Sequence, residues 1–249
     1  MIGHYHDLKD KTFLVTGASS GIGQAVAIAL GQQGAKLIIT GRDLAKLETT
    51  CQQAGAQCSL HTADLTDASA RDSLVNALPA LDGICHAAGI IKPFPVRYLN
   101  EAEFDAVFNI NAKAPILLTS ALLGKKKLNT NASIVFLSSI ASGRSTQGGS
   151  IYAASKAALE AYSRNIILEH AAKRIRANCL KPALVKTAMY EQTTRFSVMG
   201  GLEKYEKASP LGLGETADVA AAALFFLSAA SRWIAGTTLL MDGGLSAGS

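Results

Sequence analysis

Hydrophobic positions along the 249-residue chain fall into short continuous runs that alternate with longer stretches of helical spacing. The short runs are rich in β-branched residues, as is typical of strands buried on both faces of a sheet. They predict strands over residues 12–16, 37–40, 57–61, 83–86, 133–137, 176–180 and 238–241. The longer stretches predict helices over residues 21–33, 44–54, 68–78, 101–123, 150–172 and 217–228. Pro115 predicts that the fourth helix is interrupted or bent.

This alternation of strand and helix predicts the α/β class. We expect a single-domain, Rossmann-type, doubly wound parallel sheet of about seven strands, with helices on both faces. The chain contains no repeat and no linker rich in Pro, Gly or Ser, so residues 1–249 are expected to form one domain. The polar segment 189–210 interrupts the pattern after the sixth strand, where a substrate lid is expected.

Composition and charge narrow the possible partners. The chain is 49% hydrophobic and 17% charged, with a formal net charge of +5. It has no basic run interleaved with aromatics, so we expect no nucleic-acid partner. Residues 1–11 lack an apolar signal core, and the longest continuous apolar stretch, 219–227, is too short to span a bilayer. We therefore expect a cytoplasmic protein with no membrane partner.

The cysteines predict neither a metal site nor a disulfide framework. Cys51, Cys58, Cys85 and Cys179 show no CxxC spacing, and the last two lie within apolar runs. A thiol in such a run usually behaves as a small buried hydrophobe. We expect reduced cysteines and no bound metal.

A glycine-rich turn, TGASSGIG over residues 16–23, joins the first strand to the first helix. Glycines allow a tight turn and let backbone N–H groups approach a pyrophosphate at the positive end of a helix. The spacing is GxxxGxG, and a structural turn without a ligand is the alternative interpretation. The turn predicts dinucleotide contacts from Gly17, Ser19, Ser20, Gly21, Ile22 and Gly23.

The end of the second strand bears on which nicotinamide cofactor fits. NAD sites usually place a carboxylate there, but this chain has Thr40-Gly41-Arg42. A guanidinium suits a 2′-phosphate, so Arg42 predicts NADP(H) unless it is simply a solvated arginine. Asp43 is expected to cap the next helix. Asp64 and Leu65 are expected to bound the adenine pocket, although Asp64 also suits a helix cap.

A phenol and an ammonium four residues apart, Tyr152 and Lys156, share one face of a predicted helix. A nearby cation lowers the pKa of a tyrosine from its usual value of ~10 and allows it to exchange protons. Ser139 ends the fifth strand, and Asn111 lies in the preceding helix. Each residue also has a structural interpretation: a packed tyrosine, a solvated lysine, a loop cap and a helix interruption.

Taken together, these pieces resemble the short-chain dehydrogenase/reductase family over nearly the whole chain. The matching motifs are Thr16–Gly23 (TGASSGIG), Asp64-Leu65, Ala88-Gly89, Asn111, Ser138-Ser139, Tyr152–Lys156 (YAASK), Arg176-Ala177-Asn178 and Asp242-Gly243-Gly244. The resemblance implies a catalytic tetrad of Asn111, Ser139, Tyr152 and Lys156. In such a tetrad the tyrosine is the acid/base, and the lysine lowers its pKa and binds the nicotinamide ribose. The serine polarises the substrate oxygen, and the asparagine holds a relay water.

The resemblance also implies cofactor contacts from Ala88, Gly89, Pro182, Val185 and Thr187, together with Tyr152 and Lys156, and a homotetramer or homodimer. Two motifs depart from the family pattern. His86-Ala87-Ala88-Gly89 replaces NNAG, and Pro182-Ala183 replaces Pro-Gly. Alanine restricts φ where glycine does not, which puts the geometry of that loop in question.

The sequence therefore predicts an NADP(H)-dependent oxidoreductase that acts on a small-molecule carbonyl or secondary alcohol. One alternative is a 3-oxoacyl-acyl-carrier-protein reductase, with Lys173 and residues 125–127 as basic docking patches. Another alternative is a non-catalytic NADP(H) sensor. The substrate pocket is expected along segments 90–95, 140–149 and 189–210. Lys92, Phe94, Arg144 and Tyr190 are its candidate polar and aromatic side chains.

Overall fold

All seven predicted strands form in the computed structural model, which describes residues 5–55, 57–144, 147–191 and 208–247. The strands are β1 (Thr12–Thr16), β2 (Lys36–Gly41), β3 (Cys58–Thr62), β4 (Leu81–His86), β5 (Leu128–Leu137), β6 (Arg176–Pro182) and β7 (Thr238–Met241). They form one parallel sheet in the order β3-β2-β1-β4-β5-β6-β7. The order reverses direction beside β1, as in a doubly wound fold.

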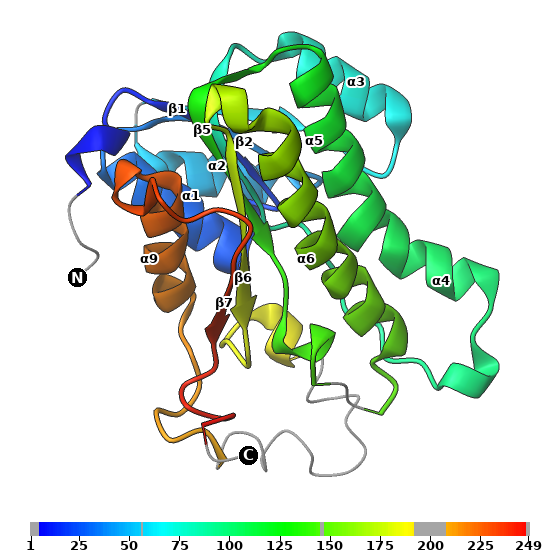
Figure 1. Ribbon diagram of the computed structural model, residues 1–249. Helices are drawn as coiled ribbons and strands as arrows, with labels where there is room; N and C mark the ends of the chain where they lie inside the picture. Colours follow the sequence, from blue (N-terminus) through cyan, green and yellow to red (C-terminus); the bar gives the residue numbers. More distant parts are fainter. Residues whose placement is uncertain (1–4, 56, 145–146, 192–207, 248–249) are drawn as a thin grey trace.

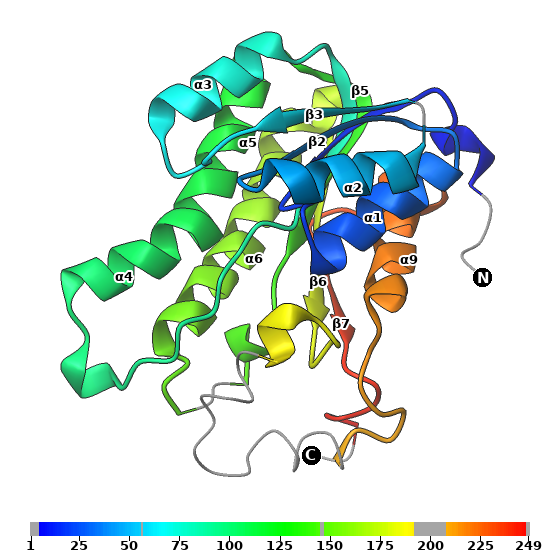
Figure 2. The same ribbon diagram turned by 180° about the vertical axis from the view of Figure 1, so that it is seen from behind.

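Helices cover both faces of the sheet (Figures 1 and 2). The α-helices are α1 (Gly21–Gln32), α2 (Leu44–Ala54), α3 (Ala68–Ala77), α4 (Glu101–Phe108), α5 (Ala114–Gly124), α6 (Ser150–His170) and α9 (Thr216–Leu227). Helices α1, α2 and α9 lie on one face, and α3, α5 and α6 lie on the other. Short helices include η2 (Val96–Tyr98) and η4 (Ile140–Ser142). The predicted α/β fold class is confirmed.

Each face has its own hydrophobic core because successive strand residues point to opposite sides of the sheet. In β1, Phe13 and Val15 pack beneath α1 and α9, and Leu14 packs on the other side. In β5, Ile134 and Phe136 belong to the α5 and α6 side. These side chains are at most 1% exposed, so the sheet is a rigid platform for the loops at its edge.

The long helical region is continuous through Pro115 but changes its winding just before it. Residues Asn109–Lys113 form a π-helical turn, η3, between α4 and α5. Pro115 has no N–H to donate to the carbonyl of Asn111 four residues earlier, and an ordinary α-turn would bring its ring against that carbonyl. The wider turn avoids that conflict, so the predicted interruption lies at residues 109–113 and not at the proline.

The helical region Glu101–Gly124 is long and apolar enough to cross a membrane by length and composition. Such a stretch is also common in the core helices of globular folds. Here 44% of its most apolar window is buried inside the fold, and α5 packs beside α3 over the sheet. The feature is therefore weak support for a membrane span.

Candidate active site

Loops at the carboxyl ends of the strands form a groove that adjoins a pocket. The groove lies at the ends of β1, β2 and β4, and the pocket lies between β5, α6 and the loop after β6. Ile22, Gly89 and Thr187 line both, so the two cavities form one continuous surface. In doubly wound folds, ligands bind at this edge, where the strand order reverses.

The glycine-rich turn is built by close backbone approach. Gly17 has a φ of +66°, and a Cβ added there would lie 2.6 Å from both the nitrogen and the Cα of Ala88. A Cβ on Gly23 would lie 2.3 Å from the carbonyl oxygen of Gly17. The Ser20 hydroxyl at the N-cap of α1 makes no capping hydrogen bond. The positive end of α1 therefore faces the groove, where an anion is favoured.

Arg42 lies at the tip of β2, is exposed and lines the groove together with Ser19. Ser19 lies against this tip, because a Cβ on Gly41 would be 3.3 Å from its Oγ. The Asp43 carboxylate accepts a hydrogen bond from the backbone nitrogen of Lys46 at 3.1 Å and caps α2, as predicted. The positively charged Arg42 is thus the side chain that strand β2 presents to the groove.

Asp64 also lines the groove, together with Leu65. Its Oδ1 accepts hydrogen bonds from the backbone nitrogen of Thr66 at 2.9 Å and from the Thr66 hydroxyl at 2.7 Å. These bonds lower the pKa of the Asp64 carboxyl. The helix-cap alternative for Asp64 is wrong, because Asp67 caps α3 through the backbone nitrogen of Ser69.

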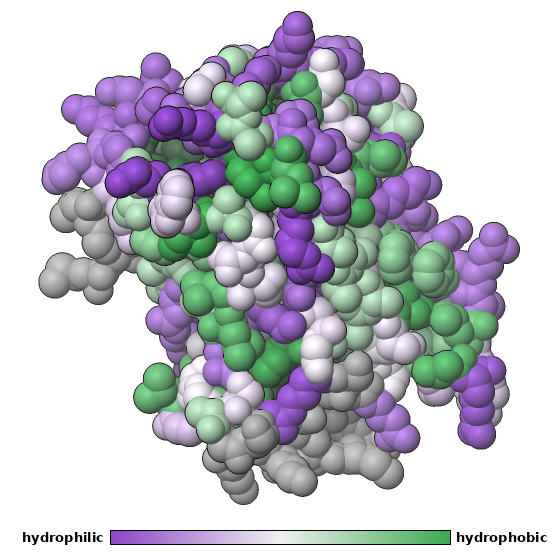
Figure 3. All heavy atoms as spheres, in the orientation of Figure 1, coloured by the Kyte–Doolittle hydropathy of each residue, from purple (hydrophilic) through white to green (hydrophobic). Residues whose placement is uncertain are grey.

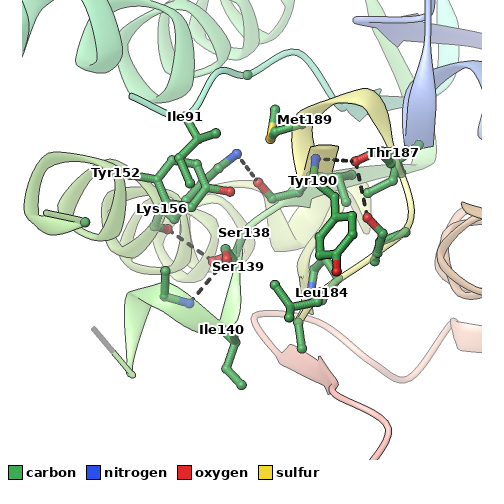
Figure 4. Close-up of a pocket in the computed structure, with 18 of the residues that line it drawn as sticks. Ile91, Ser138, Ser139, Ile140, Tyr152, Lys156, Leu184, Thr187, Met189 and Tyr190 are labelled. Carbon is green, nitrogen blue, oxygen red and sulfur yellow. Dashed lines mark hydrogen bonds between the residues drawn. The ribbon is translucent and has the colours of Figure 1, made fainter. Parts of the chain in front are cut away.

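Lys156 and Tyr152 lie on the same side of α6 and enter the pocket together (Figure 4). The Lys156 Nζ donates a hydrogen bond to the carbonyl oxygen of Leu137 at 2.8 Å and lies 5.7 Å from the centroid of the Tyr152 ring. Lys156 is only 5% exposed, and this burial lowers its pKa from 10.5 to about 8. Its proton affinity is therefore tuned toward neutrality.

Ser139 faces Tyr152 from the turn after β5 (Figure 4). Burial raises the pKa of Tyr152, and a hydrogen bond with Ser139 opposes that rise. The direction differs from the sequence expectation that Lys156 lowers this pKa. The ammonium of Lys156 is directed to the Leu137 carbonyl, and the loss of solvent around the phenol outweighs the other influences. Tyr152 is thus a protonated phenol at neutral pH.

Asn111 lies behind these residues and does not line either cavity. It is fully buried in the π-helical turn. Its Oδ1 accepts a hydrogen bond from the Ile90 nitrogen at 2.8 Å, and its Nδ2 donates to the Ile90 carbonyl at 2.9 Å and to the Ser155 Oγ at 3.1 Å. The side chain therefore braces the loop after β4 against α6.

The two departures from the family pattern are accommodated by local contacts, although the buried Nδ1 of His86 has no hydrogen-bond partner among the described residues. His86 stacks on Phe136 with ring centroids 4.9 Å apart, and its Nε2 shares a 2.9 Å hydrogen bond with the Thr119 hydroxyl. Burial lowers the pKa of His86 to about 3, so its ring is neutral. Ala183 does not require the left-handed conformation, and its nitrogen donates to the Met241 carbonyl at 2.9 Å.

The structure brings the predicted cofactor contacts together. The groove is lined by Gly17, Ser19, Ser20, Gly21, Ile22, Gly23, Arg42, Asp64, Leu65, Ala88, Gly89 and Thr187. The pocket is lined by Ile22, Gly89, Ser139, Tyr152, Lys156, Pro182, Val185 and Thr187. Of the predicted tetrad, Asn111 alone lies outside both linings, at the position described above.

The remaining pocket wall is mainly apolar. Of the side chains expected there, Arg144 and Tyr190 line the pocket, whereas Lys92 is drawn away by an ion pair with Glu103 at 2.5 Å and Phe94 is absent from the lining. Residues 192–207 of the predicted lid lie outside the described residues. Leu245 also lines the pocket and was not predicted from the sequence. The Asp242-Gly243-Gly244 motif just before it was a signal, because the two glycines form a tight turn that brings the chain back to the pocket.

Comparison with known proteins matches this arrangement over most of the chain. A family model described as enoyl-(acyl carrier protein) reductase matches residues 17–246. A 3-oxoacyl-acyl-carrier-protein reductase of Rickettsia bellii is 31% identical over 240 residues, which cover 96% of this chain and 98% of the relative. The chain belongs to the short-chain dehydrogenase/reductase family. This is a family of oxidoreductases that use nicotinamide cofactors.

Relatives with other names match equally well. The human dehydrogenase/reductase SDR family member 4 is 31% identical over 251 residues, which cover 95% of this chain and 88% of the relative. A solved short chain dehydrogenase/reductase family protein superposes with a TM-score of 0.85 at 29% identity, covering 97% of this chain and 99% of its own. The similarity therefore shows the family and the fold and leaves the substrate open.

Proposed function

We propose that the protein is an NADP(H)-dependent oxidoreductase that transfers a hydride between the nicotinamide and a small-molecule carbonyl or secondary alcohol. The observation that carries this proposal is the continuity of the two cavities. An anion-binding groove with Arg42 at one end leads into a pocket where Tyr152, Lys156 and Ser139 converge. A dinucleotide in the groove with its nicotinamide in the pocket would meet a proton donor and a hydroxyl at its reactive end.

In this mechanism the nicotinamide, when bound, supplies the hydride that reduces the carbonyl carbon. Tyr152 donates its phenolic proton to the carbonyl oxygen, which becomes the alcohol hydroxyl, and the reverse reaction returns that proton. Ser139 hydrogen-bonds the substrate oxygen and polarises it. Lys156 binds the nicotinamide ribose and stabilises the phenolate that forms. Asn111 acts from behind the site, where its side chain braces the loop after β4 against α6.

The protonation states favour reduction. Burial keeps Tyr152 protonated near neutral pH, which is the form that donates a proton to a carbonyl. Lys156, with a pKa of about 8, exchanges protons at little cost near neutrality and is suited to a relay. Oxidation requires the phenolate and is expected to need a higher pH.

The groove supports NADP(H) as the cofactor. Arg42 and Ser19 lie together at the tip of β2, where a 2′-phosphate would accept hydrogen bonds from both. The nearest carboxylate along the chain, Asp43, is occupied as the cap of α2. The other carboxylate that lines the groove, Asp64, has its pKa lowered by its hydrogen bonds to Thr66 and by the charge of Arg42. The charge that β2 itself presents to a ribose substituent is therefore positive.

The pocket supports a small carbonyl compound with apolar substituents. Ile91, Ile140, Leu184, Met189 and Leu245 provide an apolar wall around the pocket. Each hydroxyl of a sugar that faces this apolar wall without a hydrogen-bond partner would cost about 1–3 kcal/mol. An apolar ketone gains from the same burial.

A second candidate is a 3-oxoacyl-acyl-carrier-protein reductase, because several relatives carry that name. The basic residues expected to dock a carrier lie far from the pocket of the same chain. Lys173 follows the end of the 21-residue helix α6, whereas Tyr152 is in its first turn, roughly 30 Å away. The Lys125 Nζ donates to Asn76 at 2.8 Å, and Lys127 donates to the Leu78 carbonyl. This placement favours the small-molecule substrate.

We also propose a cytoplasmic homo-oligomer, a dimer or tetramer. Figure 3 shows apolar residues among polar ones on the face that includes β7 and near the outer end of α4. Leu239 and Leu240 on the edge strand β7 are 39% and 43% exposed, and Trp233 is 92% exposed. A partner copy would cover them. Sedimentation equilibrium tests this, and a monomer at micromolar concentration would refute it.

The experiment that tests the proposed function is a fluorescence titration of the purified protein with NADPH and with NADH at one salt concentration. We expect NADPH to bind at least about tenfold more tightly, since a charge-assisted phosphate contact is worth more than about 1.4 kcal/mol. A panel of ketones, sugars and acyl thioesters then identifies the substrate. Tighter NADH would overturn the cofactor assignment, and binding without turnover of any carbonyl would favour the sensor.

A further inference from the structure

Glu160 lies on the same face of α6 as the two residues that enter the pocket. Tyr152, Lys156 and Glu160 are spaced four residues apart and therefore follow one side of the helix. Glu160 is behind the turn that carries Ser139, and its side chain is only 16% exposed. A carboxylate in such a position is expected to be held by specific donors.

The donors come from the turn after β5, residues 138–143, which we call the Ser139 turn. The Glu160 Oε1 accepts a hydrogen bond from the Ser138 hydroxyl at 2.5 Å and another from the Ser142 hydroxyl. Ser138 directly precedes Ser139, and Ser142 ends the short helix η4 that Ser139 caps. One carboxylate oxygen therefore holds both flanks of Ser139 against α6, the helix that presents Tyr152.

Lys181 completes the cluster from a third element. Its Nζ lies 3.4 Å from the same Glu160 oxygen, and its side chain is 18% exposed. A Cβ on Gly143 would lie 3.1 Å from this Nζ, so the ammonium is packed against the Ser139 turn. Lys181 directly precedes Pro182, which lines the pocket. The ion pair thus joins the Ser139 turn, α6 and the end of β6 at one point.

A paired, largely buried carboxylate is costly to disturb. Charge-assisted hydrogen bonds are roughly twice as strong as neutral ones. Removal of the Glu160 carboxylate would leave the Ser138 and Ser142 hydroxyls without their acceptor and the Lys181 ammonium without its counter-charge. Ser139 makes the hydrogen bond that opposes the rise in the pKa of Tyr152. Any displacement of the Ser139 turn is therefore expected to change the pKa of Tyr152.

We propose that Glu160, supported by Lys181, is a positioning residue that fixes the Ser139 hydroxyl against Tyr152. Glu160 lines neither the groove nor the pocket and acts through Ser138 and Ser142. The inference rests on the proposed roles of Ser139 and Tyr152.

The test compares Glu160→Ala, Glu160→Gln, Lys181→Met and Ser139→Ala with a matched control, Glu169→Gln. Glu169 is an exposed glutamate on the same helix. The first readout is the tyrosinate absorbance titration of each protein, from which the signal of Tyr152 is obtained by subtracting the same protein carrying Tyr152→Phe. This readout needs neither cofactor nor substrate. The second readout is kcat and KM with NADPH and an accepted carbonyl.

We expect Glu160→Ala to move the Tyr152 titration to higher pH, toward that of Ser139→Ala. It should also lower kcat about tenfold or more while the KM for NADPH changes less than about twofold. Glu160→Gln keeps an acceptor oxygen in place, so its Tyr152 should titrate at a pH closer to that of the wild-type protein than to that of Glu160→Ala. Lys181→Met should fall between wild type and Glu160→Ala, and Glu169→Gln should match wild type.

The proposal is overturned if Glu160→Ala titrates like wild type while Ser139→Ala is shifted. It is also overturned if Glu160→Ala loses NADPH binding and thermal stability with an unchanged Tyr152 titration, because that pattern describes a purely structural residue. If the wild-type protein reduces no carbonyl, the proposed function fails, and the tyrosinate titration still decides the role of Glu160.

Discussion

The groove and the pocket at the same sheet edge are built by different means. Backbone shapes the groove: Gly17 lies so close to Ala88 that a single added carbon would be 2.6 Å away, and Arg42 is an exposed side chain at its end. Buried side chains shape the pocket, where Lys156 is 5% exposed and Ser139 is 9% exposed. These side chains are tied to backbone carbonyls and to one another.

This difference shows where specificity and chemistry can vary independently. The preference for a cofactor depends on an exposed residue that can be exchanged without disturbing the fold. The proton-transfer residues depend on burial and on shared hydrogen bonds, so a change to one alters its neighbours. Four substitutions test this contrast.

The largest effect is expected from Tyr152→Phe. Removal of the phenolic oxygen eliminates the proposed proton donor and leaves the groove unchanged, so turnover should fall about 10³-fold while NADPH binding changes little. Steady-state kinetics and fluorescence titration measure the two quantities. Near-normal turnover would refute the acid/base assignment.

Gly17→Ala should break the groove. The methyl group would meet the backbone of Ala88 in a left-handed conformation that alanine disfavours. We expect NADPH to bind about 100-fold more weakly, with a lower melting temperature, because neither backbone segment can move without cost to the strands behind it. The matched control is Gly55→Ala, where a Cβ meets nothing within 4 Å, although φ is also positive. Equal loss of binding in both variants would show that close approach is unimportant.

Arg42→Asp should weaken the preference for NADPH over NADH, with a smaller effect on NADPH binding than Gly17→Ala. The carboxylate repels a 2′-phosphate and accepts a hydrogen bond from a ribose hydroxyl. NADPH binding should weaken about tenfold or more relative to NADH, and the melting temperature of the free protein should stay the same because Arg42 is exposed. An unchanged ratio of the two dissociation constants would remove Arg42 from the cofactor site.

Lys156→Met should alter stability in a pH-dependent way. Between pH 8 and 10.5 the unfolded chain keeps a proton on Lys156 that the folded protein has released, so wild-type stability rises with pH in this window. Below it, the buried ammonium is a penalty, partly offset by its hydrogen bond to Leu137. The variant should be about 2 kcal/mol more stable near neutral pH. This advantage should shrink toward pH 10.5 in urea unfolding, and a gap that stays constant with pH would contradict the lowered pKa.

Much of the fold followed from the sequence because the strands are buried on both sides and their hydrophobic runs are continuous. The groove residues could also be predicted, since Gly17, Arg42 and Asp64 lie within a few residues of the ends of predicted strands and parallel strands end at one edge. The same logic placed Ser139 in the pocket with Tyr152 and Lys156.

Other features depend on contacts between distant segments. Glu160 meets Lys181 across 21 positions of the chain, and no local spacing reveals that pair. The pKa of Tyr152 depends on how deeply the phenol is buried, so its direction could not be predicted from the i to i+4 spacing with Lys156. The π-helical turn before Pro115 likewise follows from backbone geometry that hydrophobic periodicity does not encode.

The most direct test of hydride transfer in this site is a single-turnover experiment. The protein with bound NADPH is mixed with each member of a carbonyl panel, and the nicotinamide absorbance is followed in wild type and in Tyr152→Phe. We expect the wild-type protein to oxidise NADPH with at least one apolar ketone, whereas the variant should bind NADPH and retain its absorbance. NADPH that stays reduced in the wild-type protein with every carbonyl, or that is oxidised equally fast by both proteins, would contradict the proposed hydride transfer.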